Sequence, residues 1–176
     1  NRKEKFADIY YLEKDVDFNS IKAICQEYIK LFASGGEISF RTRSSLGGLG
    51  ESFDLLVIDE AQEYTDDQES ALKYTIAASP NPQTIYTGTP PTPHSSGTVF
   101  TNYRNDVLTG KSEEAGWAEW SVEEQSDISD IDLWYQTNPS LGLRITERII
   151  RSEMGDEIDF NIQRLGLWLK YNQKSA

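Results

Sequence analysis

Apolar and polar positions predict alternating strands and helices in the first part of the chain. Residues 6–12 and 37–42 show the aromatic, β-branched or alternating pattern that is typical of strands. Residues 17–32 carry apolar side chains at helical spacing, which predicts a helix that ends at the glycine pair 35–36. Residues 44–52 are rich in Gly and Ser and predict a loop.

A second strand–helix–strand unit follows. Residues 54–58 (DLLVI) are almost continuously apolar, as in a central strand covered on both faces of its sheet. Residues 83–87 predict the next strand. The helix between them is expected to have Asp66 as its N-cap, with Glu69 as the capping-box partner, and to run to about Ser79. This order of elements predicts an α/β fold with a parallel sheet and flanking helices.

After residue 97 the pattern becomes mainly helical. An acidic stretch at 123–132 separates two groups of expected elements. A helix at 98–108 and a strand at 117–120 are expected before the acidic stretch. Helices at 146–153 and 156–169 are expected after it. We therefore expect an α/β part over 1–97 and a helical portion over 98–176. The tryptophans are expected to anchor the C-terminal helices; they are Trp117, Trp120, Trp134 and Trp168.

Composition narrows the class of protein. The chain has 176 residues, 38% of them hydrophobic, with one Cys and no apolar run near the ~20 residues of a membrane span. A membrane-spanning helix, an internal disulfide and a wholly disordered chain are excluded. The net charge of -12 argues against a major DNA-gripping surface on this chain, because such surfaces neutralise phosphates with basic residues. No initiator Met opens the chain, so we expect a processed product or a piece of a longer protein.

The strongest chemical signal is the pair of acids that follows the apolar run. Asp59 and Glu60 directly follow Leu55–Ile58, which is the Walker B pattern. Asp59 would hold Mg²⁺, which prefers hard oxygen ligands and keeps several waters. Glu60 would orient and deprotonate the water that attacks a γ-phosphate. The alternative is a strand that ends in two solvated acids at a turn.

A second signal ends the next predicted strand. Thr87, Gly88 and Thr89 form a small polar segment where an ATPase senses the γ-phosphate, since glycine admits close approach and hydroxyls can donate or accept. Its alternative is a tight turn stiffened by Pro90 and Pro91. Two such signals on successive strands favour the functional interpretation.

The residues from Ile38 to Pro91 resemble the ATPase domain of tailed-phage terminase large subunits, the motors that pump DNA into proheads. The resemblance continues to Trp168 through NPSLG at 138–142 and RLGLW at 164–168. It implies a P-loop NTPase-like sheet, ATP and Mg²⁺ as cofactors, Asp59 as metal ligand, Glu60 as catalytic carboxylate and Thr87-Gly88-Thr89 as the coupling motif. The implied partners are double-stranded DNA, a portal protein, a small terminase subunit and sibling large subunits, in the cytoplasm of an infected host.

One family feature is missing from the sequence. No Gly-x-x-x-x-Gly-Lys-Ser/Thr occurs, and the glycine-rich stretch at 47–50 is followed by Glu51 where a phosphate-binding Lys would be needed. The resemblance therefore implies that the phosphate cradle lies outside this chain, and that the chain alone does not hydrolyse ATP efficiently.

Two other functions remain open from sequence. A helicase- or translocase-like ATPase would share the Walker B pattern, but it should carry a second α/β lobe with an arginine finger. A non-catalytic assembly module would use Asp59 and Glu60 only as surface acids.

Overall fold

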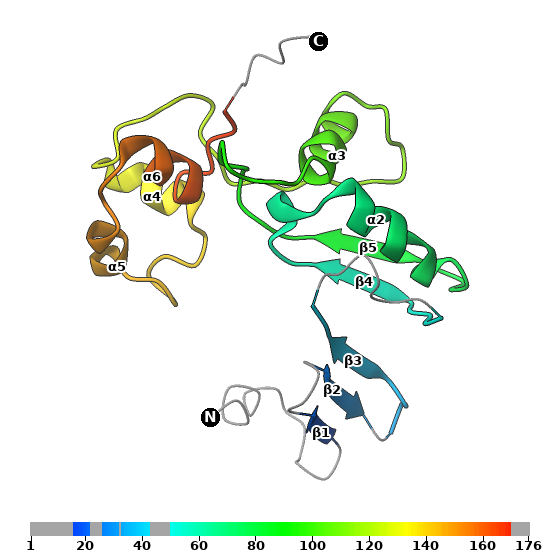
Figure 1. Ribbon diagram of the computed structural model, residues 1–176. Helices are drawn as coiled ribbons and strands as arrows, with labels where there is room; N and C mark the ends of the chain where they lie inside the picture. Colours follow the sequence, from blue (N-terminus) through cyan, green and yellow to red (C-terminus); the bar gives the residue numbers. More distant parts are fainter. Residues whose placement is uncertain (1–15, 22–25, 32, 43–49, 170–176) are drawn as a thin grey trace. The chain divides into compact units, whose positions relative to one another are not determined.

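The computed structural model describes residues 16–21, 26–31, 33–42 and 50–169. The chain divides into two compact units, residues 1–47 and 48–176, and each is described by itself (Figure 1). The strand expected at 6–12 lies outside the described residues, as does most of the loop expected at 44–52.

The first unit is an antiparallel sheet. Its strands β1 (Val16–Ile21), β2 (Gln26–Leu31) and β3 (Glu37–Phe40) lie in the order β1-β2-β3. β3 confirms the strand expected at 37–42. β2 and β3 are joined by a turn in which Gly35 has a φ of 69° and its amide donates to the Leu31 carbonyl at 2.9 Å.

The helix predicted for residues 17–32 is wrong, because this segment supplies β1 and β2. Its apolar residues fit a helical period and also pair across a hairpin. Phe18 lies opposite Ile29, and Ile29 lies opposite Ile38 on β3. β-branched residues such as Ile29 and Ile38 stabilise a cross-strand pair, so pairing along the sheet outweighs the local helical period. The glycine pair accordingly forms a turn between strands.

The second unit contains the expected parallel strand pair. β4 (Leu55–Ile58) and β5 (Gln83–Tyr86) pair in parallel, with Leu55 opposite Gln83 and Ile58 opposite Tyr86. The crossover holds α2 (Asp66–Leu72) between two 3₁₀ turns, η2 (Ala61–Glu63) and η3 (Lys73–Ile76). In Figure 1, α2 lies along one side of this strand pair.

The start of α2 differs from the expectation. Its N-cap is Thr65, whose hydroxyl accepts a hydrogen bond from the Gln68 amide, while the Gln68 side chain accepts one from the Thr65 amide. Asp66 is instead the first helical residue, and its carboxylate accepts a 2.6 Å hydrogen bond from Thr98. The capping box is therefore one residue earlier than predicted. The helix ends at Leu72, before the predicted Ser79, and η3 continues the segment.

Only one face of the β4–β5 pair is covered by the described residues. Ile58 is buried in a core shared with Ala61, Tyr64, Val99 and Phe100. The side chains of the opposite face are exposed, Leu55 at 46%, Val57 at 54% and Ile85 at 46%. The expectation of a strand covered on both faces is thus wrong for this unit, since the elements that pack on it lie on one side.

The rest of the second unit is mainly helical, as expected. Its helices are α3 (Val99–Leu108), α4 (Ile131–Thr137), α5 (Glu147–Ser152) and α6 (Glu157–Gln163). A second core joins the last three of them around Trp134, Ile150 and Phe160. α6 is shorter than predicted, and Gly166, with a φ of 68°, lies just beyond it. Acids of the stretch 123–132 have local roles, such as Asp130 capping α4.

Residues 117–120 form no strand, contrary to the prediction. Their side chains pack and bond individually: Trp117 stacks at 5.1 Å from Phe100, and Glu119 pairs with Arg104. Three of the tryptophans are anchors as expected. Trp134 is fully buried and donates to the Ile128 carbonyl, while Trp117 and Trp168 pack around Phe100. Trp120 is not an anchor, since it is 57% exposed.

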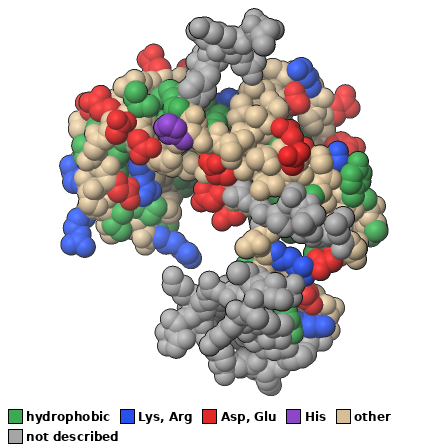
Figure 2. All heavy atoms as spheres, in the orientation of Figure 1, with side chains coloured by type: hydrophobic (Ala, Val, Ile, Leu, Met, Phe, Trp, Pro, Cys, Tyr) green, Lys and Arg blue, Asp and Glu red, His purple; other side chains and the backbone are tan. Residues whose placement is uncertain are grey.

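The core of this unit crosses residue 97, since Ile58 and Phe100 pack in one cluster. The functional boundary expected between 97 and 98 stays a prediction. Among the described residues, no helix has the length and apolar character needed to cross a membrane. Figure 2 shows acidic side chains spread over the described surface, consistent with the net charge of -12.

Candidate functional site at the edge of the parallel strands

The two chemical segments predicted from sequence meet at one edge of the sheet. Parallel strands end on the same side, so the residues after β4 and after β5 become neighbours. The Thr87 amide donates to the Ile58 carbonyl at 2.9 Å, and the Ala61 amide donates to the Thr87 carbonyl at 2.9 Å. Backbone hydrogen bonds therefore fix the two segments relative to each other, independently of their side chains.

Asp59 and Thr87 are in direct contact at this edge. The Thr87 hydroxyl donates a 2.8 Å hydrogen bond to Asp59 Oδ1, and both residues are exposed. This bond orients a carboxylate that is open to solvent on its other side. Such an arrangement offers a hard oxygen ligand in a fixed position.

The donor set fits one kind of metal site. Among the described residues, no group of three or more His, Cys, Asp or Glu side chains comes together to hold a metal. A protein cage for Ca²⁺ or Zn²⁺ is therefore not formed by this part of the chain. Mg²⁺ commonly takes only one or two carboxylates and completes its shell with waters and substrate phosphates. Asp59, supported by Thr87, fits that role.

Glu60 has an unusual backbone. Its φ of 52° and ψ of 50° place it in the left-handed region, the single non-glycine case among the residues described. Such a conformation costs on the order of 1 kcal/mol and is concentrated at functional sites. The side chain is exposed, and its Oε2 accepts a 2.5 Å hydrogen bond from Gln62 Nε2. The conformation turns the chain directly from β4 into η2 and presents the carboxylate at the edge.

Close packing leaves room only for a glycine at position 88. A Cβ at this position would lie 2.4 Å from Gln62 Oε1 and 3.0 Å from the Ala61 amide nitrogen. A side chain at residue 88 would thus displace the residues that follow Glu60. Thr89 is partly buried, and its hydroxyl has no hydrogen-bond partner among the described residues. The three residues of the segment therefore face different surroundings, with Thr87 at the open edge and Thr89 turned inward.

Gln62 was not singled out from the sequence. It is 9% exposed, and it contacts both predicted segments through Glu60 and Gly88. The available signal was its place in the run after the paired acids, between Ala61 and Tyr64, which are both buried. The side chain packs against Gly88, which is distant in sequence, so its burial could not be read from the neighbouring residues.

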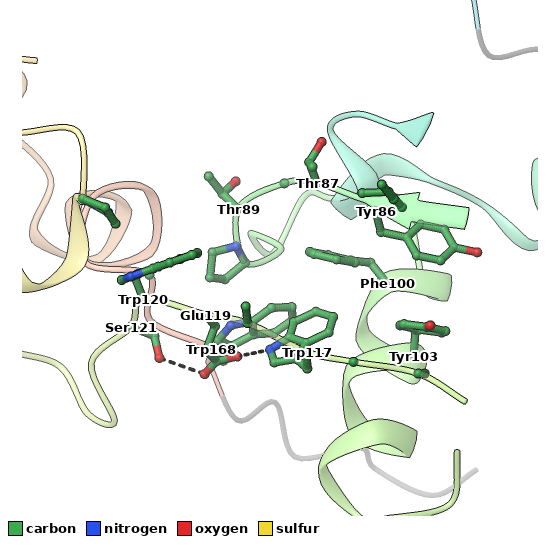
Figure 3. Close-up of a pocket in the computed structure, with 18 of the residues that line it drawn as sticks. Tyr86, Thr87, Thr89, Phe100, Tyr103, Trp117, Glu119, Trp120, Ser121 and Trp168 are labelled. Carbon is green, nitrogen blue, oxygen red and sulfur yellow. Dashed lines mark hydrogen bonds between the residues drawn. The ribbon is translucent and has the colours of Figure 1, made fainter. Parts of the chain in front are cut away.

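A cavity of about 1270 Å³ lies beside β5 (Figure 3). It is lined by β5 and Thr87–Pro90, together with residues 114–121, 137–140, 162–164, 166 and 168. In the close-up, Trp117 and Trp168 lie near Phe100, and dashed lines join Glu119 to Trp117 and Ser121. Burial, followed by the charge of Glu69 and the proximity of Tyr103, raises the pKa of Tyr86 to about 12.

The segments that carried the resemblance beyond the ATPase motifs also meet. Asn138 Nδ2 donates to the Arg164 carbonyl at 3.0 Å, and the Val122 amide donates to the Leu165 carbonyl at 3.0 Å. A Cβ on Gly166 would lie 2.5 Å from the Trp120 carbonyl oxygen. The RLGLW segment thus packs against both the NPSLG segment and the chain around Trp120.

Comparison with known proteins shows which fold this chain shares. No family model and no curated protein matches the chain. A solved structure does match: the large terminase of bacteriophage HK97, with a TM-score of 0.67 and 16% sequence identity. The match covers 88% of this chain. The chain has the fold of a segment of a large terminase. It spans 33% of the HK97 large terminase chain, about a third of its length.

The large-terminase resemblance inferred from the motifs is thus confirmed as a fold. The mixed α/β architecture with its parallel strand pair is confirmed with it. The roles expected for Asp59, Glu60 and Thr87-Gly88-Thr89 stay predictions, as do the cofactors ATP and Mg²⁺.

Proposed function

We propose that this chain is a segment of a phage terminase large subunit, an ATP-hydrolysing motor that translocates double-stranded DNA into proheads. The observation that carries the proposal is the Thr87–Asp59 hydrogen bond at the shared edge of β4 and β5, within a large-terminase fold. An assembly module that used Asp59 only as a surface acid would have no need for this orientation.

Each residue of the edge has a separate task in the proposed reaction. Asp59 would hold Mg²⁺, which supplies charge to the phosphates during hydrolysis. Glu60 would accept a proton from the attacking water, a task that suits an exposed carboxylate at a fixed backbone position. Thr87, Gly88 and Thr89 would report the phosphate state to the rest of the motor.

The phosphate-binding loop is assigned to another part of the same large subunit. The sequence of this chain holds no Gly-x-x-x-x-Gly-Lys-Ser/Thr, so the P-loop NTPase-like sheet would be completed from outside it. The chain by itself is therefore expected to lack ATPase activity.

The proposed partners follow from the same assignment. Double-stranded DNA would be held mainly by other parts of the motor, because this chain has a net charge of -12. A portal protein, a small terminase subunit and sibling large subunits would complete the machine in the cytoplasm of the infected host.

The test is Mg²⁺-dependent ATP hydrolysis by the full-length large subunit, comparing the wild type with Glu60→Gln. The variant keeps the side-chain shape and removes the proton acceptor. We expect kcat to fall by about 10²- to 10⁴-fold while nucleotide still binds. Equal activity of the two proteins would refute the role of Glu60. Absence of activity in both, with DNA present, would favour an assembly module.

A further inference from the structure

Gln62 connects the two segments of the candidate site. Its backbone carbonyl accepts a 3.2 Å hydrogen bond from the Gly97 amide, which ties η2 to the residues just before α3. Its side chain lies between the Glu60 carboxylate and Gly88. Both of these neighbours belong to the proposed catalytic and coupling segments.

The chemistry of the amide sets its orientation. An ionised carboxylate only accepts hydrogen bonds, so the Gln62 NH₂ group must face Glu60. The contact is 2.5 Å, from Nε2 to Glu60 Oε2. Gln62 Oε1 is thereby directed to the other side, where a Cβ on residue 88 would approach it to 2.4 Å. A glycine at 88 is what allows Gln62 to hold Glu60 in this way.

Two buried polar atoms near this contact lack partners among the described residues. They are Gln62 Oε1, a hydrogen-bond acceptor, and Thr89 Oγ1, a donor. They belong to segments that touch at Gly88. Leaving such groups unsatisfied costs about 1–3 kcal/mol each, so a small shift of the Thr87–Thr89 segment that joins them would be favourable.

We propose that Gln62 is the positioning residue through which the Thr87-Gly88-Thr89 segment controls the orientation of the Glu60 carboxylate. Movement of this segment presses on or bonds to Gln62 Oε1, and the same rigid amide carries the change to Glu60 through Nε2. The inference rests on the proposed function, because it assumes that Glu60 is the proton acceptor.

The first test is Gln62→Met in the full-length large subunit. Methionine keeps the length and burial of the side chain but removes the amide. We expect kcat to fall on the order of 10²-fold, as for a misplaced catalytic group, with KM and the dissociation constant of a fluorescent ATP analogue unchanged. The matched control is Gln125→Met, a change at an exposed glutamine in the acidic stretch, which should leave kcat, KM and this dissociation constant unchanged.

The second test does not remove Gln62. Gly88→Ala places a methyl group against Gln62 Oε1 and should reproduce the loss in kcat. In a Gln62→Ala background the same methyl group meets less obstruction, so the two losses should not add. Additive losses would overturn the inference. This second variant keeps the inference testable if Gln62→Met lowers the melting temperature too far for assay.

The outcomes separate this inference from the proposed function. If Glu60→Gln abolishes turnover but Gln62→Met and Gly88→Ala retain wild-type kcat, the positioning role is refuted and the motor assignment stands. If Glu60→Gln has no effect, the assignment of Glu60 itself fails. A tenfold or larger rise in the dissociation constant of the ATP analogue for Gln62→Met would also refute the inference, because it would show a role in binding.

Discussion

Arg104 and Glu119 form a two-point ion pair between α3 and the segment that precedes the acidic stretch. Arg104 Nε lies 2.6 Å from Glu119 Oε2, and Nη2 lies 2.8 Å from Oε1. Trp117 Nε1 and Ser121 Oγ donate to the same carboxylate at 2.6 and 2.8 Å. The guanidinium also stacks at 4.5 Å over the Trp168 ring. This network holds the end of the described chain against α3.

The network predicts a pH-dependent contribution to stability. The Arg104 hydrogen bonds are the largest cause that lowers the pKa of Glu119, from 4.5 to about 2, with Trp117 and Ser121 adding to it. Because this pKa is lower in the folded chain, the contribution is complete above about pH 4.5 and is lost as the pH falls toward 2. Glu119→Gln should lower the free energy of unfolding at pH 7 by about 1 kcal/mol, as expected for a partly exposed pair.

Urea unfolding of the wild type and Glu119→Gln at several pH values would measure this contribution. The difference between them should shrink below pH 4.5. Glu113→Gln, at an exposed acid of the same segment, is the control and should have little effect at any pH. A difference at pH 7 that persists unchanged at pH 2.5 would contradict an electrostatic origin.

Gly166 should tolerate no side chain. Its φ of 68° disfavours other residues, and a Cβ would lie 2.5 Å from the Trp120 carbonyl oxygen. Gly166→Ala should lower the free energy of unfolding by about 3 kcal/mol, since strain and a backbone clash add together. Gly110→Ala is the matched control, because Gly110 has a φ of 71° but open space around it. Its loss should be only about 1 kcal/mol. Equal losses in thermal unfolding would show that the clash at Gly166 is relieved.

The side-chain amide of Asn138 should contribute to the stability of the fold. Its Nδ2 donates to the carbonyls of Trp134 and Arg164, each at 3.0 Å. Asn138→Asp keeps the shape but places a carboxylate oxygen against these acceptors, so it should cost about 2–3 kcal/mol of stability at pH 7. Asn138→Ala should cost less, because it leaves no repulsion. Chemical unfolding followed by tryptophan fluorescence would measure both, and the reverse order would contradict the hydrogen-bond assignment.

The hydroxyl of Thr87 should affect the Mg²⁺ requirement of the ATPase reaction. Thr87→Val removes the hydrogen bond to Asp59 and keeps the side-chain volume, so the Mg²⁺ concentration for half-maximal ATPase activity of the full-length protein should rise about 10-fold or more. Thr87→Ser keeps the hydroxyl and should stay close to the wild type. If valine and serine variants shift the Mg²⁺ requirement equally, the hydroxyl does not orient Asp59.

The parts of the structure that the sequence could predict are those with a local signature. The apolar run of β4 and the acids after it lie together in sequence, and the C-terminal ends of parallel strands lie on the same side of a sheet. The placement of the two polar segments at one edge could therefore be predicted, whereas the hydrogen bond between Thr87 and Asp59 came from the structure. The hairpin of β1 and β2 could not be predicted in this way, because the same apolar positions fit a helix. Pairing between neighbouring strands, and not the local apolar period, decided the outcome.

The burial of Gln62 and the exposure of Trp120 were beyond prediction for the same reason. The Gln62 side chain packs against Gly88, 26 positions further along the chain, and the backbone of Trp120 packs against Gly166 while its side chain stays exposed. Neither the burial of Gln62 nor the exposure of Trp120 can be predicted from the residues next to it in sequence. The exposure of Leu55 and Val57 likewise depends on which elements pack on the sheet.

The backbone bonds from Thr87 to Ile58 and from Ala61 to Thr87 have a consequence for sequence divergence. They use only backbone atoms, which every amino acid except proline carries, so exchanging side chains of β4 and β5 for other non-proline ones leaves these bonds available. Two chains can therefore drift to 16% identity and still retain this fold. Relatives of this chain would accordingly be easier to find by searching for a few residues at such an edge than by comparing whole sequences.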